Sequence, residues 1–186
     1  MLVRLLVDYT NFNPNYLNTQ MKYILIILIP LFFVQDDTYN AIAALNKKME
    51  AAFNAGDLEK VASFYLDDAY LLSPGGQKVS GREAIDQYWL GIKNPVRWEL
   101  EVIAVERDEA DIYENEYWQA LPNKPPGWRV NGVDIDEDDE LVYQLGRSTL
   151  VTMRNGEEKA SVVDFLLIWK YTDGEYRILL DTYTWQ

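Results

Sequence analysis

The chain has 186 residues, of which 48% are hydrophobic, which is enough apolar material for the core of one ordinary domain. Its formal net charge is −13 and it has no Lys/Arg cluster, so nucleic acid is not expected as a partner, because binding a polyanion requires basic groups that displace counterions. It has no cysteine and no histidine, which excludes disulfides, thiolate or imidazole metal ligands and Cys- or His-dependent catalysis, and leaves Asp, Glu, Tyr or Lys for any acid–base role.

The N-terminal region resembles an export signal placed after a second start. Residues 1–20 are aperiodic, and we interpret them as a leader or a mis-assigned start, with Met21 as the true first residue. Residues 21–35 contain Lys22 and the apolar stretch Tyr23–Val34, which is too short to span a bilayer but typical of a signal peptide. We therefore expect a periplasmic or secreted protein with its domain at 38–186. An uncleaved anchor and a buried apolar tail remain alternatives.

Helical periodicity comes first in the domain. Apolar residues recur at intervals of three and four in Asn40–Asn54 and again in Leu58–Tyr65, with Asp57 as the cap between them. A strand is predicted at Ala69–Leu72. The sequence Ser80-Gly81-Arg82-Glu83 fits a capping box, in which the serine hydroxyl and the glutamate carboxylate each accept a hydrogen bond from an otherwise unpaired backbone N–H. This motif predicts a third helix through Ile92.

The pattern then changes to the alternation of extended strands. Five segments show it: Trp98–Ala104, Ile112–Trp118, Leu141–Met153, Ala160–Tyr171 and Tyr176–Trp185. Asn155-Gly156 is a strong hairpin signal between the third and the fourth. Helices followed by an antiparallel meander predict an α+β fold.

A Pro-rich, acidic insertion at 121–140 interrupts this alternation. Its acidic run, Asp134–Glu140, has the carboxylates that calcium prefers, but it lacks the glycine and the ligand spacing of an EF-hand loop. We favour a solvated acidic loop over a calcium site, and we expect no metal site and no cofactor.

Four motifs give a family resemblance over Asn40–Gln186. They are Phe53-Asn54-Ala55-Gly56-Asp57-Leu58, Phe64-Tyr65-Leu66-Asp67-Asp68-Ala69, Ser80-Gly81-Arg82-Glu83-Ala84-Ile85 and Trp169-Lys170-Tyr171-Thr172-Asp173-Gly174. With them the chain resembles the nuclear-transport-factor-2-like superfamily, in its SnoaL-like and ketosteroid-isomerase-like branch. The resemblance implies a cone-shaped, curved antiparallel sheet around three N-terminal helices, an apolar cavity, and often a homodimer through the outer sheet face. The fold does not settle the function.

Three positions separate this chain from the ketosteroid isomerases it resembles. The alignment places Met49 at the family's tyrosine, Ser73 at its Asp base and Leu167 at its oxyanion acid. Serine without a base beside it does not abstract a proton near neutral pH, and Met and Leu donate no useful hydrogen bond. We therefore expect Met49, Ser73 and Leu167 to contact a ligand without supporting steroid-type isomerisation.

The same alignment predicts which side chains face the cavity. Tyr65 and Trp89 fall at lining positions, and Asp181 and Tyr183 share one face of the last strand. An unpaired carboxylate on an apolar face is costly unless its pKa rises. Asp181 is thus a candidate general base or ligand anchor, with Tyr65, Tyr183 and Ser73 as hydrogen-bond partners and Trp89 stacked on a flat ligand.

A purely structural interpretation is the alternative. Asp181 would then pair with Arg177 or another nearby cation, and the aromatic residues would be core. Asp164 has the opposite parity in its strand, which places it on the outer face, where a dimer contact is favoured over chemistry.

Two functions remain open. The first is an exported domain that binds a small, mostly apolar molecule without turnover. The second is a cofactor-independent lyase, isomerase or hydrolase that uses Asp181 as acid/base. A domain that serves only dimerisation would have its cavity filled by its own side chains.

Overall fold

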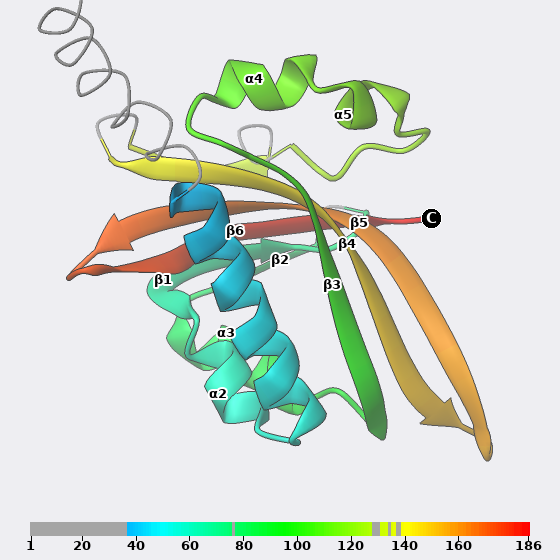
Figure 1. The fold of residues 1–186 in the computed structure, drawn as a ribbon. Helices are drawn as coiled ribbons and strands as arrows, with labels where there is room; N and C mark the ends of the chain where they lie inside the picture. Colours follow the sequence, from blue (N-terminus) through cyan, green and yellow to red (C-terminus); the bar gives the residue numbers. More distant parts are fainter. Residues whose placement is uncertain (1–36, 76, 128–130, 134, 137–138) are drawn as a thin grey trace, which may run out of the picture. The chain divides into compact units, whose positions relative to one another are not determined.

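The computed structural model describes residues 37–75, 77–127, 131–133, 135–136 and 139–186. The chain divides into two compact units, Met1–Tyr39 and Asn40–Gln186, and every element labelled in Figure 1 lies in the second. The leader predicted at 1–20 and the signal-like segment at 21–35 lie outside the described residues, so both stay predictions. Within the described ranges, no helix has the length and apolarity needed to cross a membrane.

Three helices precede most of the sheet, as predicted. Residues 37–54 form the first, which buries Ile42, Met49 and Phe53. The second, α2 (Leu58–Ala62), begins at Asp57, whose side chain accepts the Lys60 N–H. It ends earlier than predicted, because Tyr65 already pairs with the last strand.

The third helix, α3, covers Arg82–Leu90 and starts differently from the prediction. Its N-cap is Gly81, which makes no side-chain cap hydrogen bond, while Ser80 ends a strand. The predicted capping box is therefore wrong. Gly81 has a φ of 84°, a left-handed conformation that glycine adopts without strain, so the chain turns from the strand into the helix at this residue.

The described part of the chain contains six strands, which form one curved sheet in the order β2-β1-β6-β5-β4-β3. Their bounds are β1 (Tyr65–Leu72), β2 (Lys78–Ser80), β3 (Pro95–Glu106), β4 (Leu141–Arg154), β5 (Glu157–Thr172) and β6 (Glu175–Trp185). The predicted α+β class is confirmed. The sheet is mixed and not wholly antiparallel, since β1 runs parallel to β6. No tight turn joins these two strands, so hairpin geometry does not fix their relative direction.

The segment predicted as a strand at Ile112–Trp118 is helical instead. It forms α4 (Glu109–Glu114) and α5 (Glu116–Ala120), which are capped by the side chains of Asp108 and Asn115. Ile112 and Trp118 are buried in an apolar cluster with side chains of the central strands, including Leu145, Leu166 and Leu180. Local caps and this packing overrode the strand-like composition.

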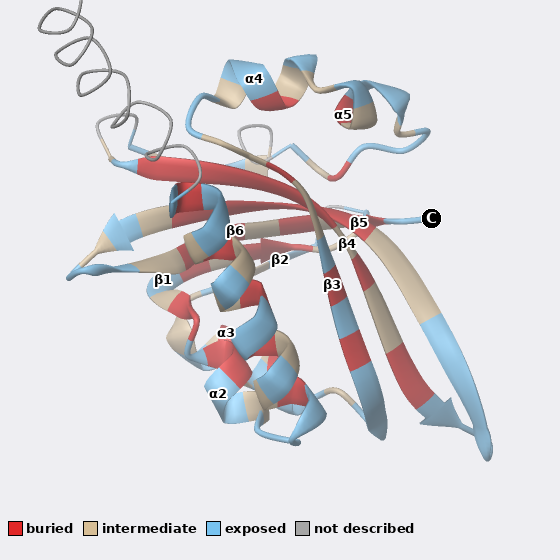
Figure 2. Cartoon of the chain, in the orientation of Figure 1, coloured by how far each residue is buried: buried red, intermediate tan, exposed pale blue. Residues whose placement is uncertain are grey.

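The two helices and the loop after them cover part of the sheet face opposite the N-terminal helices (Figure 1). The loop is attached to the sheet at two points: Thr182 donates to the Pro126 carbonyl at 2.8 Å, and Lys170 pairs with Asp139 at 2.7 Å. We call the side that carries α4 and α5 the outer face and the side that carries the N-terminal helices the inner face. Figure 2 shows buried residues concentrated on the central strands between these two layers.

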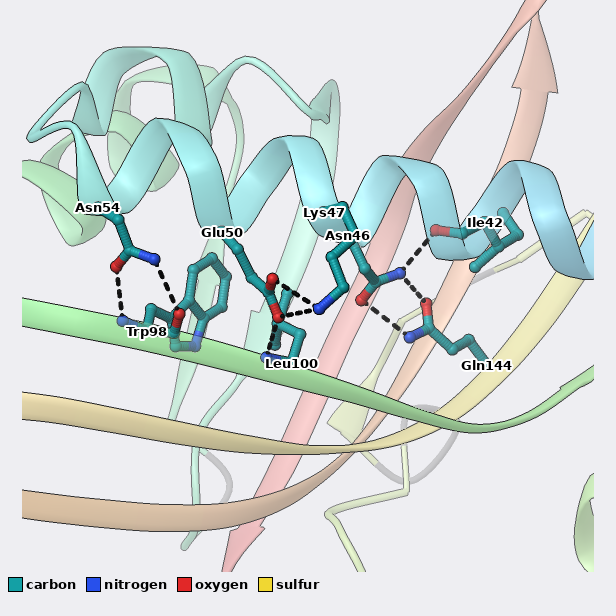
Figure 3. Close-up of polar contacts among 8 residues, drawn as sticks. All are labelled: Ile42, Asn46, Lys47, Glu50, Asn54, Trp98, Leu100 and Gln144. Atoms are coloured by element: carbon teal, nitrogen blue, oxygen red, sulfur yellow. Dashed lines mark hydrogen bonds and ion pairs between the residues drawn. The ribbon is translucent and has the colours of Figure 1, made fainter.

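The first helix protects β3, which is an edge strand. Asn54 pairs with the backbone of Trp98 through two hydrogen bonds, accepting its N–H at 2.8 Å and donating to its carbonyl at 3.1 Å (Figure 3). Glu50 accepts the N–H of Leu100. These side chains occupy backbone groups through which an edge strand would otherwise pair with another chain.

A buried amide pair fixes the same helix on the inner face. Asn46 and Gln144 exchange hydrogen bonds of 3.0 and 3.1 Å, and Asn46 also donates to the Ile42 carbonyl (Figure 3). Trp169 donates its indole N–H to Gln144 at 2.9 Å. Because every buried polar group here finds a partner, the network specifies one position of the helix along the sheet.

Candidate functional site

The inner face of the sheet holds a cavity of about 140 Å³ that the protein's own side chains leave unfilled. The first helix, α3 and strands β1, β3, β4, β5 and β6 all contribute to it. Its lining is mostly apolar and aromatic: Met49, Tyr65, Tyr88, Trp89, Ile92, Trp98, Leu100, Ser148, Leu150, Arg154, Ser161, Val163, Phe165, Leu167, Asp181, Tyr183 and Trp185.

Strand alternation explains why polar and apolar groups meet here. Asp181 and Tyr183 lie two residues apart on β6, so both point inward, and they pair in register with Leu167 and Phe165 of β5. On the other side, Asp181 is level with Leu71 of the parallel strand β1. One acidic side chain is thus set among aromatic and aliphatic neighbours in this part of the wall.

Asp181 has one hydrogen-bond partner among the described residues. The Tyr65 hydroxyl donates to its Oδ2 at 2.7 Å, and its Oδ1 accepts no hydrogen bond from the described part of the chain. The side chain lines the cavity and keeps part of its surface accessible. Burial raises the pKa of Asp181 from 3.8 to about 6, although the Tyr65 hydrogen bond acts in the opposite direction. A substantial fraction of this carboxyl is therefore protonated in mildly acidic solution.

Three tyrosine hydroxyls surround this carboxyl. The hydroxyls of Tyr88 and Tyr183 lie 3.0 Å apart and share a hydrogen bond. Burial raises the pKa of Tyr65, Tyr88 and Tyr183, and the negative charge of Asp181 raises each further. All three stay protonated at neutral pH, so each can donate a hydrogen bond but none can act as a base.

Trp89 joins the site to the core. Its ring centroid lies 5.1 Å from that of Trp98 and 6.1 Å from that of Tyr65. Its indole Nε1 is buried and has no hydrogen-bond partner among the described residues, yet it lies close enough to the Tyr65 hydroxyl to lower the pKa of Tyr65 slightly. The aromatic cluster forms a rigid wall because its rings pack edge to face and at a tilt.

The structure brings together most of the residues proposed from the sequence. Met49, Tyr65, Trp89, Leu167, Asp181 and Tyr183 all line the cavity. Ser73 does not: it lies beyond the end of β1, in the turn to β2, where its backbone N–H donates to the Gln77 carbonyl at 3.0 Å. The alignment that placed Ser73 in the site crosses an irregularity between Tyr65 and Tyr70, where the register of β1 against β6 shifts.

The alternative ion pair with Arg177 does not form. Arg177 pairs with Glu175 on its own strand, at 2.5 Å. The predicted outer-face position of Asp164 is correct, but its predicted dimer contact is not, because it is 1% exposed and bound within the chain. Arg147 donates a hydrogen bond to the Asp164 carboxylate at 3.0 Å. The hydroxyl of Tyr117 in α5 donates a second one.

Sequence reasoning missed several lining residues, among them the aromatic residues Tyr88, Trp98, Phe165 and Trp185. Helical spacing puts Tyr88 on the same side of α3 as Ile85 and Trp89, and strand alternation puts Trp98 on the same face of β3 as Leu100, so a signal for both was present in the sequence. Only the fold shows that these faces meet around a hollow.

No metal site is apparent in the described ranges, where no group of three or more acidic side chains is placed to hold an ion. Of the acidic run once considered for calcium, Asp134, Glu137 and Asp138 lie outside the described residues.

Comparisons with known proteins agree with this geometry. The model of the SnoaL-like domain family matches residues 47–115. No curated protein matches the chain. Among solved structures, a protein of unknown function from Mycobacterium tuberculosis has a TM-score of 0.56 at 14% identity, covering 83% of this chain and 75% of that one.

Two further solved structures show the same fold. A putative calcium/calmodulin-dependent protein kinase II association domain from Xanthomonas campestris has a TM-score of 0.53 at 19% identity, covering 78% of this chain and 85% of that one. A ketosteroid isomerase-like protein from Erwinia carotovora atroseptica has a TM-score of 0.50 at 16% identity, covering 76% and 91%. The resemblance predicted from the sequence is confirmed at this level: residues 47–115 match the SnoaL-like domain family, and the fold is similar to that of solved ketosteroid isomerase-like and nuclear-transport-factor-2-like proteins.

Proposed function

We propose that this protein is a binding domain for one small, mostly apolar molecule held in the inner-face cavity. The observation that carries the proposal is an unfilled aromatic cavity with a single accessible carboxylate in its wall. A cavity of about 140 Å³ is close in size to those that hold a benzene-sized molecule. Apolar lining with a few placed polar groups is the usual composition of a small-molecule site.

Filling the cavity tests this proposal. Leu150 lines it and is half-buried, so Leu150→Trp should project the indole into the hollow. Met153 is 37% exposed on the opposite face of the same strand, and Met153→Trp adds the same group outside the cavity. We expect monocyclic aromatic probes, measured by calorimetry, to bind the wild type and Met153→Trp but not Leu150→Trp. Equal binding by both variants would place the ligand elsewhere.

A second candidate function is acid–base catalysis by Asp181. It is favoured by the raised pKa of this carboxyl, about 6, and by the lack of a cation partner for it among the described residues. A base whose pKa lies near the working pH is well suited to proton transfer, and the neutral hydroxyls of Tyr65, Tyr88 and Tyr183 could stabilise developing negative charge.

A small aromatic probe of proton abstraction tests this second function. In 5-nitrobenzisoxazole, a base removes the C3 proton while the N–O bond breaks, and the product is a coloured cyanophenolate. If Asp181 is a competent base, the rate should rise with pH through about 6 and fall to background in Asp181→Asn. A rate that is unchanged in Asp181→Asn would exclude this role.

Export and dimerisation complete the proposal. Export rests on the apolar stretch Tyr23–Val34, and N-terminal sequencing of protein recovered from cell fractions tests it. A homodimer is proposed from the family resemblance. Because α4 and α5 cover part of the outer face, such a dimer would use the part of this face that they leave open. Light scattering of the protein with and without residues 107–140 would show whether the two helices limit dimerisation.

A further inference from the structure

We propose that the ligand of this cavity carries a positively charged ammonium group, which lies against Asp181 while its apolar body contacts the aromatic wall. This inference rests on the proposed binding function and specifies the chemical class of the ligand. Four features of the described residues support it.

The first feature is that one carboxylate oxygen of Asp181 accepts no hydrogen bond from the described residues. Tyr65 occupies Oδ2, and Oδ1 receives no hydrogen bond from the described residues although the side chain is accessible from the cavity. An ionised carboxylate only accepts hydrogen bonds. The group that best completes this site is therefore a donor, and a cationic donor also offsets the unfavourable charge of a carboxylate in an apolar wall.

The second feature is that no cationic side chain of the described residues lies against Asp181 to offset its charge. The groups that face Asp181 are the neutral hydroxyls of Tyr65, Tyr88 and Tyr183. Among the described residues, Arg154 is the only basic side chain in the cavity lining, and it pairs in register with Glu157 at the hairpin, whereas Asp181 pairs with Leu167. Along β5 those two positions are about 30 Å apart.

The third feature is the aromatic wall beside the carboxylate. Tyr65, Tyr88, Trp89 and Trp98 form a connected cluster with ring centroids 5.1 to 6.1 Å apart. Faces of Trp and Tyr rings attract ammonium groups, and enclosures of aromatic residues with an acid are suited to alkylated ammonium groups. A ligand with a free carboxylate would meet the Asp181 charge and is disfavoured.

The fourth feature is the charge of the whole chain. At −13, the protein raises the local concentration of cations and repels anions. The effect is general and does not select this cavity, but it acts in the same direction as the local chemistry.

A matched pair of probes tests the inference: benzylammonium, which has N–H donors and stays charged at both pH values used, and the neutral benzyl alcohol, titrated by calorimetry at pH 7.5. The cation should bind at least about tenfold more tightly, since a charge-assisted contact contributes about 1.5–3 kcal/mol. Asp181→Asn should lose about tenfold for the cation and leave benzyl alcohol within about twofold. Asp68→Asn removes the same charge from an exposed position and should change neither.

The wild type provides a test that needs no variant. Because the cation requires the ionised carboxylate and the pKa of Asp181 is about 6, lowering the pH from 7.5 to 5 should weaken cation binding about tenfold and leave benzyl alcohol unchanged.

The outcomes separate the two proposals. If benzyl alcohol binds as tightly as the cation, or if cation binding is the same at both pH values and in Asp181→Asn, the ammonium inference is overturned while the binding function stands. If neither probe binds the wild type at millimolar concentration, the cavity is not a site for ligands of this class and both proposals are overturned.

Discussion

Asp164 and Asp181, on neighbouring strands, share much of their chemistry but differ in role. Each is enclosed by the fold and each accepts a tyrosine hydroxyl, from Tyr117 and Tyr65 respectively. Asp164 also has Arg147 at 3.0 Å, beneath α5 on the outer face, whereas Asp181 has no cation partner within the described ranges and faces a cavity. The presence of one guanidinium thus distinguishes a carboxylate that holds the fold together from one that is available to a ligand.

The largest effect should come from removing that guanidinium. Arg147→Met leaves Asp164, 1% exposed, without its ion pair, and we expect a loss of about 2–4 kcal/mol in the free energy of unfolding. Urea unfolding measures it. The control is Arg177→Met, which breaks an exposed pair and should change stability by less than about 1 kcal/mol. Equal losses in the two variants would contradict the distinction between the faces.

A change at Gly146 should affect both the stability of the fold and the cavity. An added Cβ would lie 2.2 Å from Cζ of Phe165 and 2.6 Å from the Glu101 carbonyl oxygen. Gly146→Ala should therefore destabilise the fold by about 1–3 kcal/mol and push the Phe165 ring into the cavity. Weaker binding of the aromatic probes would show this. Adding Phe165→Leu should restore part of the stability, and no recovery would mean that the backbone contact dominates.

The pH dependence of stability should report the ionisation of Asp181. Its folded pKa, about 6, lies above the unfolded value of 3.8, so the folded state binds more protons between these values and stability falls as pH rises through them. Above pH 6, Asp181→Asn should be more stable than the wild type by on the order of 1 kcal/mol, a discounted value because the carboxylate is accessible from the cavity.

Chemical unfolding of both proteins at pH 4 and pH 7 measures this effect. The advantage of Asp181→Asn should shrink toward pH 4, where the wild-type carboxyl is protonated. An advantage that grows as the pH is lowered would contradict the assignment.

The smallest effect is expected at Ser73. It lies in the turn after β1 and outside the cavity lining, so Ser73→Ala should leave probe affinity within about twofold and stability within about 0.5 kcal/mol. A large loss of affinity would show that the turn contributes to the site after all.

The sequence predicted the parts of this molecule that follow from local periodicity. The alternation in the last strand placed Asp181 and Tyr183 on one face, and the helical repeats before Asn54 placed Met49 on the apolar side of the first helix, whereas their place at the cavity was implied by the family resemblance. Which residues share a face needed only the spacing along one element. The alternation in β5 likewise separated the residues of its two faces, and it placed Asp164 on the outer face of the sheet.

The errors arose where one element depends on another. Ile112 and Trp118 fit a strand by composition, but the caps at Asp108 and Asn115 and the outer face of the sheet made them helical. Ser73 was displaced by the register irregularity in β1, which depends on pairing with β6. The partner that neutralises Asp164, Arg147, lies on another strand, and no spacing in the sequence pairs the two.

The most direct test of this account is the ionisation of Asp181 itself. NMR titration of its side-chain carboxyl carbon, assigned by comparison with Asp181→Asn, should give a pKa of about 6, because burial without a cation disfavours the charged form. A pKa near or below 4 would contradict the account, since it would mean that this carboxylate is solvated or paired and not held open in an apolar cavity.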